Sequence, residues 1–243
     1  MKLHILGSSS AGNAYLLNAG NELLLVECGV QFKEVEKAAN FALKDIKGVI
    51  VSHEHGDHAK SIKKCQKYRI PIYASLGTLK ACGVTGNAMK GLQIYKIGGF
   101  TVRPFGVVHD AAEPFGFLIY HADMGSLLFA TDTPYLPYKF AGLNHIMIEC
   151  NYTKSILNAN VKSGRIGTVL RNRTVASHMS LETCLETLAV NDLTRVSNII
   201  LIHLSDANSD AAVFRDAVAR RTAIATTIAV PGVTINLSNK PNF

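Results

Sequence analysis

Three histidines and an aspartate follow one short apolar stretch of the chain, and together they could hold metal ions. Residues 48–52 read Gly-Val-Ile-Val-Ser, which is typical of a buried strand, and His53, His55, Asp57 and His58 follow directly. Because side chains alternate between the two faces of a strand, His53 and His55 can point the same way just past its end. The glycine before Asp57 permits a tight turn that brings Asp57 and His58 alongside. The spacing offers two ligand pairs, and imidazole with carboxylate suits zinc, manganese or iron in a two-metal hydrolytic site.

The composition of the chain makes this cluster specific. Histidine accounts for only 9 of 243 residues. Three histidines and an aspartate in so short a window therefore arise by chance on the order of one time in a thousand. A solvated, histidine-rich turn is the alternative interpretation. We favour a metal site because the motif follows a strand, as the chemistry requires.

The stretch that ends at His58 resembles the signature motif of the metallo-β-lactamase superfamily. The resemblance implies an α/β fold, a four-layer αββα sandwich, with a site for one or two metals at one edge of its sheets. It also implies that further ligands lie elsewhere in the chain.

Three residues at the ends of apolar segments match the remaining ligands of that superfamily. They are His109, Asp132 and His203. Taken alone, His109 would more often be a structural histidine, and Asp132 could cap a helix or form an Asx turn. The resemblance instead implies that the Asp132 carboxylate bridges two metals, since each of its two oxygens can bind one.

The resemblance assigns every ligand to one of two ions. The first metal takes His53, His55, His109 and Asp132. The second metal takes Asp57, His58, Asp132 and His203. The expected cofactors are therefore two divalent ions, zinc in the first place and manganese as the alternative. A hydroxide shared by the ions is the expected nucleophile, because coordination lowers the pKa of water towards about 7.

Two further residues, Glu149 and His178, narrow the reaction. Glu149 ends an apolar segment, and His178 lies just before a predicted helix. The pair resembles the nuclease and phosphodiesterase branches of the superfamily, in which the histidine contacts the scissile phosphate or protonates the leaving oxygen. An alkoxide leaving group needs a proton, and an imidazole tuned by a carboxylate can supply it. We therefore expect Asp57, Glu149 and His178 to be catalytic; the alternative places His178 on the surface beside a helix cap.

Three loop motifs resemble the YycJ-like (WalJ) group of the superfamily, which is described as exonuclease-like. They are residues 7–13 (Gly-Ser-Ser-Ser-Ala-Gly-Asn), 178–180 (His-Met-Ser) and 203–205 (His-Leu-Ser), and the likeness covers nearly the whole chain. One departure is Glu27-Cys28-Gly29, where the group commonly has Asp-Cys-Gly. We expect the longer acid to change the orientation of a ligand more than to abolish metal binding.

Strands and helices alternate along the chain and must position these residues. Apolar runs predict strands at residues 2–6, 14–17, 22–26, 48–52, 71–74, 100–108, 115–120, 126–130, 145–150, 198–204, 226–230 and 233–237. Helical periodicity predicts helices at residues 31–43, 59–68, 181–190 and 211–220. Residues 7–13 are expected to form a turn-rich loop. No linker divides the chain, so residues 1–243 are expected to form a single metallo-β-lactamase-fold domain.

The overall composition is that of a globular protein. Hydrophobic residues make up 48% and charged residues 18% of the chain, which excludes a disordered protein. No apolar run approaches the roughly 20 residues of a membrane span. The five scattered cysteines lack a Cys-x-x-Cys pair, which favours reduced thiols and a cytoplasmic location.

The chain is basic, with a formal net charge of +7. This favours anionic partners such as nucleotides or nucleic acid. The segment 162–173 carries Lys162, Arg165, Arg171 and Arg173. It could form a phosphate-binding arm, but we favour a solvated connection between strands. The chain has no Trp, so a platform for stacking bases is not evident.

The expected function is a dinuclear metal-dependent hydrolase that cleaves phosphodiester bonds, in the first place those of nucleic acid. One alternative is a cyclic- or small-nucleotide phosphodiesterase that degrades nucleotide signals. Another is a thioester or lactone hydrolase, which Glu149 and His178 disfavour because a thiolate leaving group needs no proton donor. A metal-stabilised binding protein without catalysis is the third. A second copy could complete the cleft of so compact a chain, so a homodimer is expected.

Overall fold

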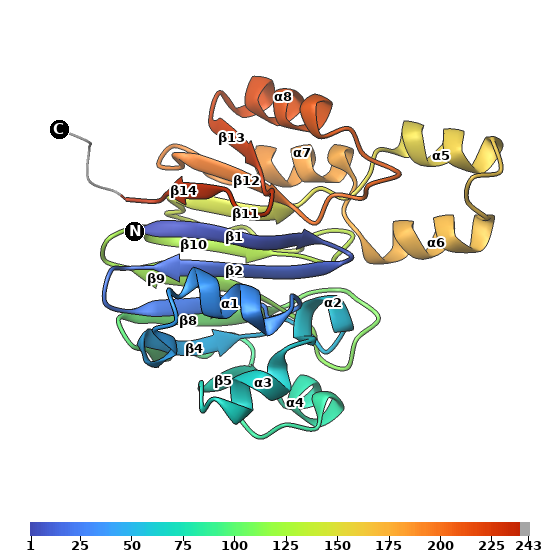
Figure 1. The fold of residues 1–243 in the computed structure, drawn as a ribbon. Helices are drawn as coiled ribbons and strands as arrows, with labels where there is room; N and C mark the ends of the chain where they lie inside the picture. The colour runs from blue at the N-terminus through green and yellow to red at the C-terminus, as the bar shows by residue number, and fades with distance from the viewer. Residues whose placement is uncertain (239–243) are drawn as a thin grey trace.

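A computed structural model describes residues 1–238 and contains two seven-stranded β-sheets with helices on their outer sides (Figure 1). Across the first sheet the order is β14 (Thr234–Asn236), β1 (Lys2–Ser9), β2 (Gly12–Asn18), β3 (Leu23–Val26), β4 (Ile46–Ile50), β5 (Ile72–Ser75) and β6 (Asn87–Met89). Across the second it is β13 (Ala225–Ile228), β12 (Asn198–Ile202), β11 (His145–Glu149), β10 (Gly125–Ala130), β9 (Phe115–His121), β8 (Phe100–Gly106) and β7 (Tyr95–Ile97). The last strand, β14, thus joins the sheet in which the chain began.

Parallel pairing sets the direction of the strands that precede the site. Strands β3 to β5 run parallel to one another, and so do strands β10 to β13. The last four residues of β12 are all apolar and buried, as expected for a parallel strand that is covered on both faces. Because parallel strands end at the same edge of a sheet, the residues that follow β10, β11 and β12 lie together.

A central apolar cluster fills the space between the two sheets. It contains Tyr15 of β2 together with Phe117 of β9 and Phe129 of β10. The rings of Tyr15 and Phe129 meet edge to face at a centroid distance of 5.7 Å. The two sheets are therefore held together by side chains from both halves of the chain.

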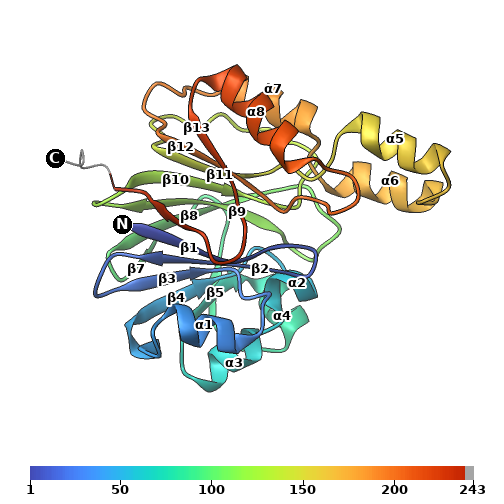
Figure 2. The ribbon, with the colours of Figure 1, turned by 45° about the horizontal axis from the view of Figure 1, so that its top comes forward.

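Helices cover the two outer faces. The first sheet carries α1 (Phe32–Ala38), α3 (Ile62–Lys67) and α4 (Leu76–Cys82), and the second carries α7 (Leu181–Ala189) and α8 (Ala211–Thr222). A separate apolar cluster lies beneath each set of helices. The predicted αββα order of layers is confirmed, as Figure 2 shows from a second direction.

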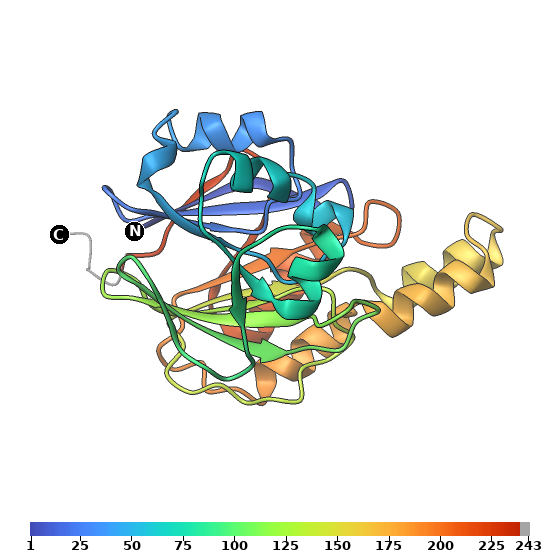
Figure 3. The same cartoon turned by 90° about the horizontal axis from the view of Figure 1, so that it is seen from below.

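Two further helices leave the sandwich. The helices α5 (Lys154–Lys162) and α6 (Thr168–Ser177) lie side by side and project beyond the edge of the sheets, as Figures 1 and 3 show. We call residues 154–177 the arm. Among residues 1–238, no helix has the length and apolar character needed to cross a membrane.

Most predicted elements are present with shifted boundaries, but two expectations were wrong. Residues 7–13 are not a loop, because β1 continues to Ser9 and β2 begins at Gly12. Gly7 and Gly12 allow the two strands to approach closely. A Cβ at Gly7 would lie only 2.4 Å from the carbonyl oxygen of Gly12. The helix expected at residues 31–43 ends at Ala38.

The segment 162–173 is mostly exposed, as expected of a solvated connection, and it forms part of a helical hairpin that was not predicted. The two arm helices bury few side chains, Leu157 and Asn160 in α5 and Thr174 and Ser177 in α6. They therefore lack the broad apolar stripe by which a helix is recognised in a sequence.

We expect Phe129→Ala to lower the free energy of unfolding by about 3–5 kcal/mol, the usual cost of removing a buried aromatic side chain. Urea denaturation followed by circular dichroism measures this. Tyr120→Ala, on the neighbouring strand β9 and 48% exposed, is the control and should change stability by less than about 1 kcal/mol. Equal losses in the two variants would contradict the role of the central cluster.

Candidate metal centre

All of the predicted metal ligands converge at one edge of the sandwich, between the two sheets. His53 and His55 follow β4, and Asp57 and His58 lie in the short helix α2 (Gly56–Ala59). The remaining ligands, His109, Asp132 and His203, follow β8, β10 and β12. Gly56 begins α2 without a positive φ, so helix geometry, and not a glycine turn, places Asp57 and His58.

The first group of ligand atoms comes from His53, His55, His109 and Asp132, which lie within 4.8 Å of one another. The Nε2 atoms of His53 and His109 lie 3.6 Å and 3.5 Å from Oδ2 of Asp132. The Nε2 of His53 is buried and has no hydrogen-bond partner within the described part of the chain. An unpaired buried nitrogen is costly, and ligation of a divalent ion would remove that cost.

The second group comes from Asp57, His58, Asp132 and His203, again within 4.8 Å of one another. Oδ2 of Asp57 lies 3.2 Å from Nε2 of His58 and 3.3 Å from Nε2 of His203. Oδ2 of Asp132 lies 3.4 Å from Nε2 of His58. Imidazole and carboxylate donors in this proportion fit a divalent transition metal.

Asp132 belongs to both groups. Its carboxylate is buried, and the Thr131 hydroxyl donates a 2.8 Å hydrogen bond to Oδ1. Burial acts to raise the pKa of Asp132, but the positive charges of His203 and His58 hold it well below its usual range. Asp132 and His203 also have positive φ angles of 47° and 54°, which few residues other than glycine adopt. Both ligands therefore sit on tight turns directly after their strands.

A third group places Glu149 and His178 beside the ligands. Oε1 of Glu149 lies 2.7 Å from Nδ1 of His178 and 3.0 Å from Nδ1 of His203. Oε2 accepts hydrogen bonds from the backbone N–H groups of Thr133 and Met179. Burial acts to lower the pKa of His178, but the charge and hydrogen bond of Glu149 outweigh it and raise that pKa. The structure thus brings together the acid and the histidine that the sequence paired.

The turn Glu27-Cys28-Gly29 packs against Asp57 and His58 of the second group. Oε2 of Glu27 lies 3.4 Å from Nδ1 of His58, and the backbone N–H of Cys28 donates to the carbonyl oxygen of His58 at 2.8 Å. A Cβ added to Gly29 would lie only 1.6 Å from the carbonyl oxygen of Asp57. The ligand loop therefore rests directly on this turn, with no space between them.

Sequence analysis assigned no role to several polar residues that touch the ligands, among them Asn13 and Ser8. Nδ2 of Asn13 lies 3.3 Å from Oδ2 of Asp57 and 3.2 Å from Nε2 of His58. The hydroxyl of Ser8 accepts a 3.0 Å hydrogen bond from the backbone N–H of His203. Contacts of this kind orient metal ligands. The only signal in the sequence was the motif of residues 7–13, whose residues were assigned to a loop.

A cleft of about 360 Å³ lies over the three groups. Its walls include His55, Asp57, His109, Asp132, His178 and His203, and also Ile166, Leu170, Arg173 and Thr174 of the arm. The arm therefore forms one wall of the candidate site, a placement that the sequence did not reveal.

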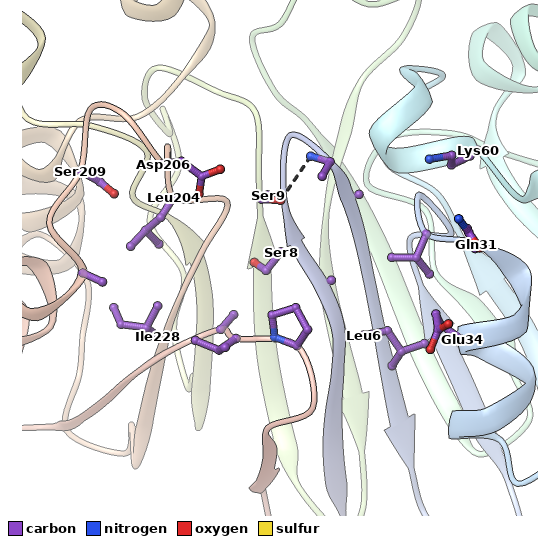
Figure 4. A pocket seen from close by; sticks show the side chains of 18 of the residues that line it. Leu6, Ser8, Ser9, Gln31, Glu34, Lys60, Leu204, Asp206, Ser209 and Ile228 are labelled. Atoms are coloured by element: carbon purple, nitrogen blue, oxygen red, sulfur yellow. Dashed lines mark hydrogen bonds between the residues drawn. The ribbon is translucent and has the colours of Figure 1, made fainter. Parts of the chain in front are cut away.

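A larger groove, of about 730 Å³, adjoins the turn between β1 and β2 (Figure 4). None of its described lining residues is a histidine, and its lysines, Lys33 and Lys60, are matched by Glu34 and Asp206. The smaller cleft is the candidate site because it alone of the two holds the convergent ligand groups.

Residues 13–204 match the protein family described as "Beta-lactamase superfamily domain". The chain belongs to the β-lactamase superfamily. The matched region includes every residue of the three ligand groups. The superfamily resemblance expected from the His-x-His-x-Asp-His motif is confirmed.

Relatives within the superfamily agree with the predicted group. The chain is 30% identical over 225 residues to the exodeoxyribonuclease YycJ of Bacillus anthracis, covering 84% of this chain and 83% of the relative. It is 28% identical over 228 residues to the exodeoxyribonuclease WalJ of Streptococcus pneumoniae, covering 86% and 83%. Among solved structures, the metallo-β-lactamase fold protein YhfI of Bacillus subtilis matches with a TM-score of 0.75 and 18% identity, over 96% of this chain and 98% of that one.

We expect Gly29→Ala to displace the loop of Asp57 and His58 and to weaken zinc binding by about 10–100-fold, as the loss of supporting contacts does at other metal sites. Isothermal titration calorimetry measures the affinity, and circular dichroism checks the fold. The matched control is Gly56→Ala in the same ligand loop, where an added Cβ meets nothing within 4 Å. Wild-type affinity in Gly29→Ala would contradict the tight packing of the turn against the loop.

Proposed function

We propose that the chain is a divalent-metal-dependent phosphodiesterase that hydrolyses nucleic acid. The observation that carries this proposal is the 2.7 Å pair of Glu149 and His178 beside two ligand groups that share Asp132. A site that needed only a metal-activated nucleophile would not require this pair. The exodeoxyribonuclease relatives support nucleic acid as the substrate.

The proposed cofactors are two divalent ions, zinc in the first place and manganese as the alternative. His53, His55, His109 and Asp132 would hold one ion. Asp57, His58, Asp132 and His203 would hold the other. When bound, such ions lower the pKa of coordinated water and offset the charge of a phosphate.

The chain's own residues would then orient the substrate and supply a proton. Glu149 engages Nδ1 of His178, which leaves Nε2 as the ring nitrogen that can reach a substrate in the cleft. Nε2 could donate to a phosphate oxygen or to the leaving alkoxide. The backbone N–H groups of Thr133 and Met179 fix Glu149 in place, so the imidazole is held before substrate arrives.

A cyclic- or small-nucleotide phosphodiesterase is the second candidate. A cleft of about 360 Å³ lies within the range of sites that bind small molecules, roughly 300–1,000 Å³. Thioester hydrolysis is disfavoured, since a thiolate leaving group needs no proton from the Glu149–His178 pair.

Two further expectations belong to the proposal. All five cysteines are free thiols, which suits a reducing cytoplasm. The expected homodimer stays a prediction that sedimentation velocity can test.

We expect wild-type protein to bind two zinc ions per chain, as measured by inductively coupled plasma mass spectrometry. We also expect it to hydrolyse the chromogenic diester bis(para-nitrophenyl) phosphate. His53→Ala should lose metal from the first group and reduce activity by about 100-fold or more. Loss of a residue that only supports a ligand typically costs about 10–100-fold. His4→Ala is the control, because His4 bonds Thr234 far from the ligand groups. Full metal loading without any diester hydrolysis would refute the proposed reaction.

We expect His178→Ala to slow cleavage of an oligonucleotide by about 10²–10⁴-fold, the usual contribution of a general acid. The loss should be smaller for the nitrophenyl diester, whose leaving group needs little protonation. The metal content should equal that of wild type. If His178→Ala instead loses a metal ion, His178 is a ligand within the third group and not a substrate contact.

A further inference from the structure

The arm forms one wall of the cleft, and all of its charged residues are positive. From these two observations we infer that residues 154–177 are the surface that binds the phosphate backbone of a nucleic acid strand entering the site. This inference rests on the proposed function and adds to it a polymeric substrate and the element that holds it.

The position of α6 supports this role. Leu170, Arg173 and Thr174 of α6 line the cleft, and their spacing puts them on one side of the helix. Ile166, just before the helix, lines it too. The helix ends at Ser177, and His178 follows at once. A strand lying along α6 would therefore lead directly to His178 and the ligand groups.

The charge of the arm is of one sign. Its charged residues are Lys154, Lys162, Arg165, Arg171 and Arg173, and residues 154–177 contain no Asp or Glu. The whole chain has 25 Lys and Arg against 18 Asp and Glu, so without the arm it is nearly neutral. Residues 60–69 also carry five cations and no acid, but none of them lines the cleft. A basic surface on an element that borders the candidate site is the electrostatic footprint of a phosphate-binding site.

Arg173 is placed to take the phosphate nearest the site. Its guanidinium lies 3.7 Å from the carboxylate of Asp110, the residue after the ligand His109, and both side chains are more than half exposed. An exposed pair of this kind contributes little stability, so a phosphate could replace Asp110 at small cost. The planar guanidinium can bind phosphate oxygens through two hydrogen bonds.

The remaining side chains indicate what is recognised. The arm contains no Phe, Tyr or Trp, so bases cannot stack on it. Leu170 and Val169 are exposed and can contact sugars. The ten residues of α6 span about 15 Å, the rise of roughly four nucleotides in one strand of a duplex. Recognition would thus follow the backbone and not the sequence of the strand.

The larger groove beside the β1–β2 turn is less suited to a polyanion. Its lining contains two lysines and two acidic residues, so its net charge is close to zero. The arm is the better candidate for binding phosphates because it contains five cations and no acidic residue.

The decisive comparison is between a dinucleotide and a DNA strand longer than about ten nucleotides, a length that exceeds the span of α6. Two arm variants are made, Arg173→Ala and the double variant Lys162→Ala with Arg165→Ala. Arg215→Ala on α8 is the matched control, because Arg215 is half exposed and likewise paired with an aspartate. KM and kcat are measured for both substrates, and binding of an uncleavable phosphorothioate strand to the metal-loaded protein is followed by fluorescence anisotropy.

We expect the double variant to raise KM for the strand by roughly tenfold and to affect the dinucleotide much less. The slope of log affinity against log salt concentration should fall by about 1.4, since each lost contact to a single strand removes about 0.7. Arg173→Ala should weaken both substrates, because it faces the cleft. Arg215→Ala should match wild type.

Several results would overturn the inference. Wild-type strand affinity in both arm variants would do so, and so would equal losses for strand and dinucleotide in the double variant. A dimer in wild type that dissociates in the arm variants, seen by sedimentation velocity, would make the arm a contact between two copies of the chain. If wild type cleaves no phosphodiester but binds the strand through the arm, the proposed reaction fails while the inference stands.

Discussion

The buried carboxylate of Asp132 is the contact on which the rest of the site depends. Four imidazoles, those of His53, His58, His109 and His203, come within 3.6 Å of its oxygens. A buried carboxylate is stable only when positive charge or a metal compensates it. The ends of strands from both sheets must therefore meet at one place, and the αββα packing provides this meeting point.

Holding the ligands there requires backbone conformations that are unfavourable by themselves. Glu27, Asp132 and His203 all have positive φ angles, and each such residue costs on the order of 1–3 kcal/mol. The three apolar clusters on and between the sheets offset this cost. Close packing at Gly29, the hydrogen bond donated by Asn13 and the one accepted by Ser8 then fix the direction of the ligands.

The ligand groups and most of the arm lie in different parts of the structure. The ligand groups lie between the sheets and are largely buried, whereas the arm projects from the sandwich and is mostly exposed. An exposed hairpin can vary without disturbing the metal centre.

The sequence by itself determined the ligand types and most of the strands. The spacing from His53 to His58 is local, and the apolar runs before His109, Asp132 and His203 are long enough to predict strand ends. Only the tertiary structure decided what supports and surrounds them. Asn13 contacts Asp57, which lies 44 residues away in the sequence. Gly29 is required because the backbone of Asp57, in another loop, packs directly against it. The two arm helices were not predicted because they bury few side chains. A sequence pattern indicates a helix chiefly through the apolar face that the helix buries.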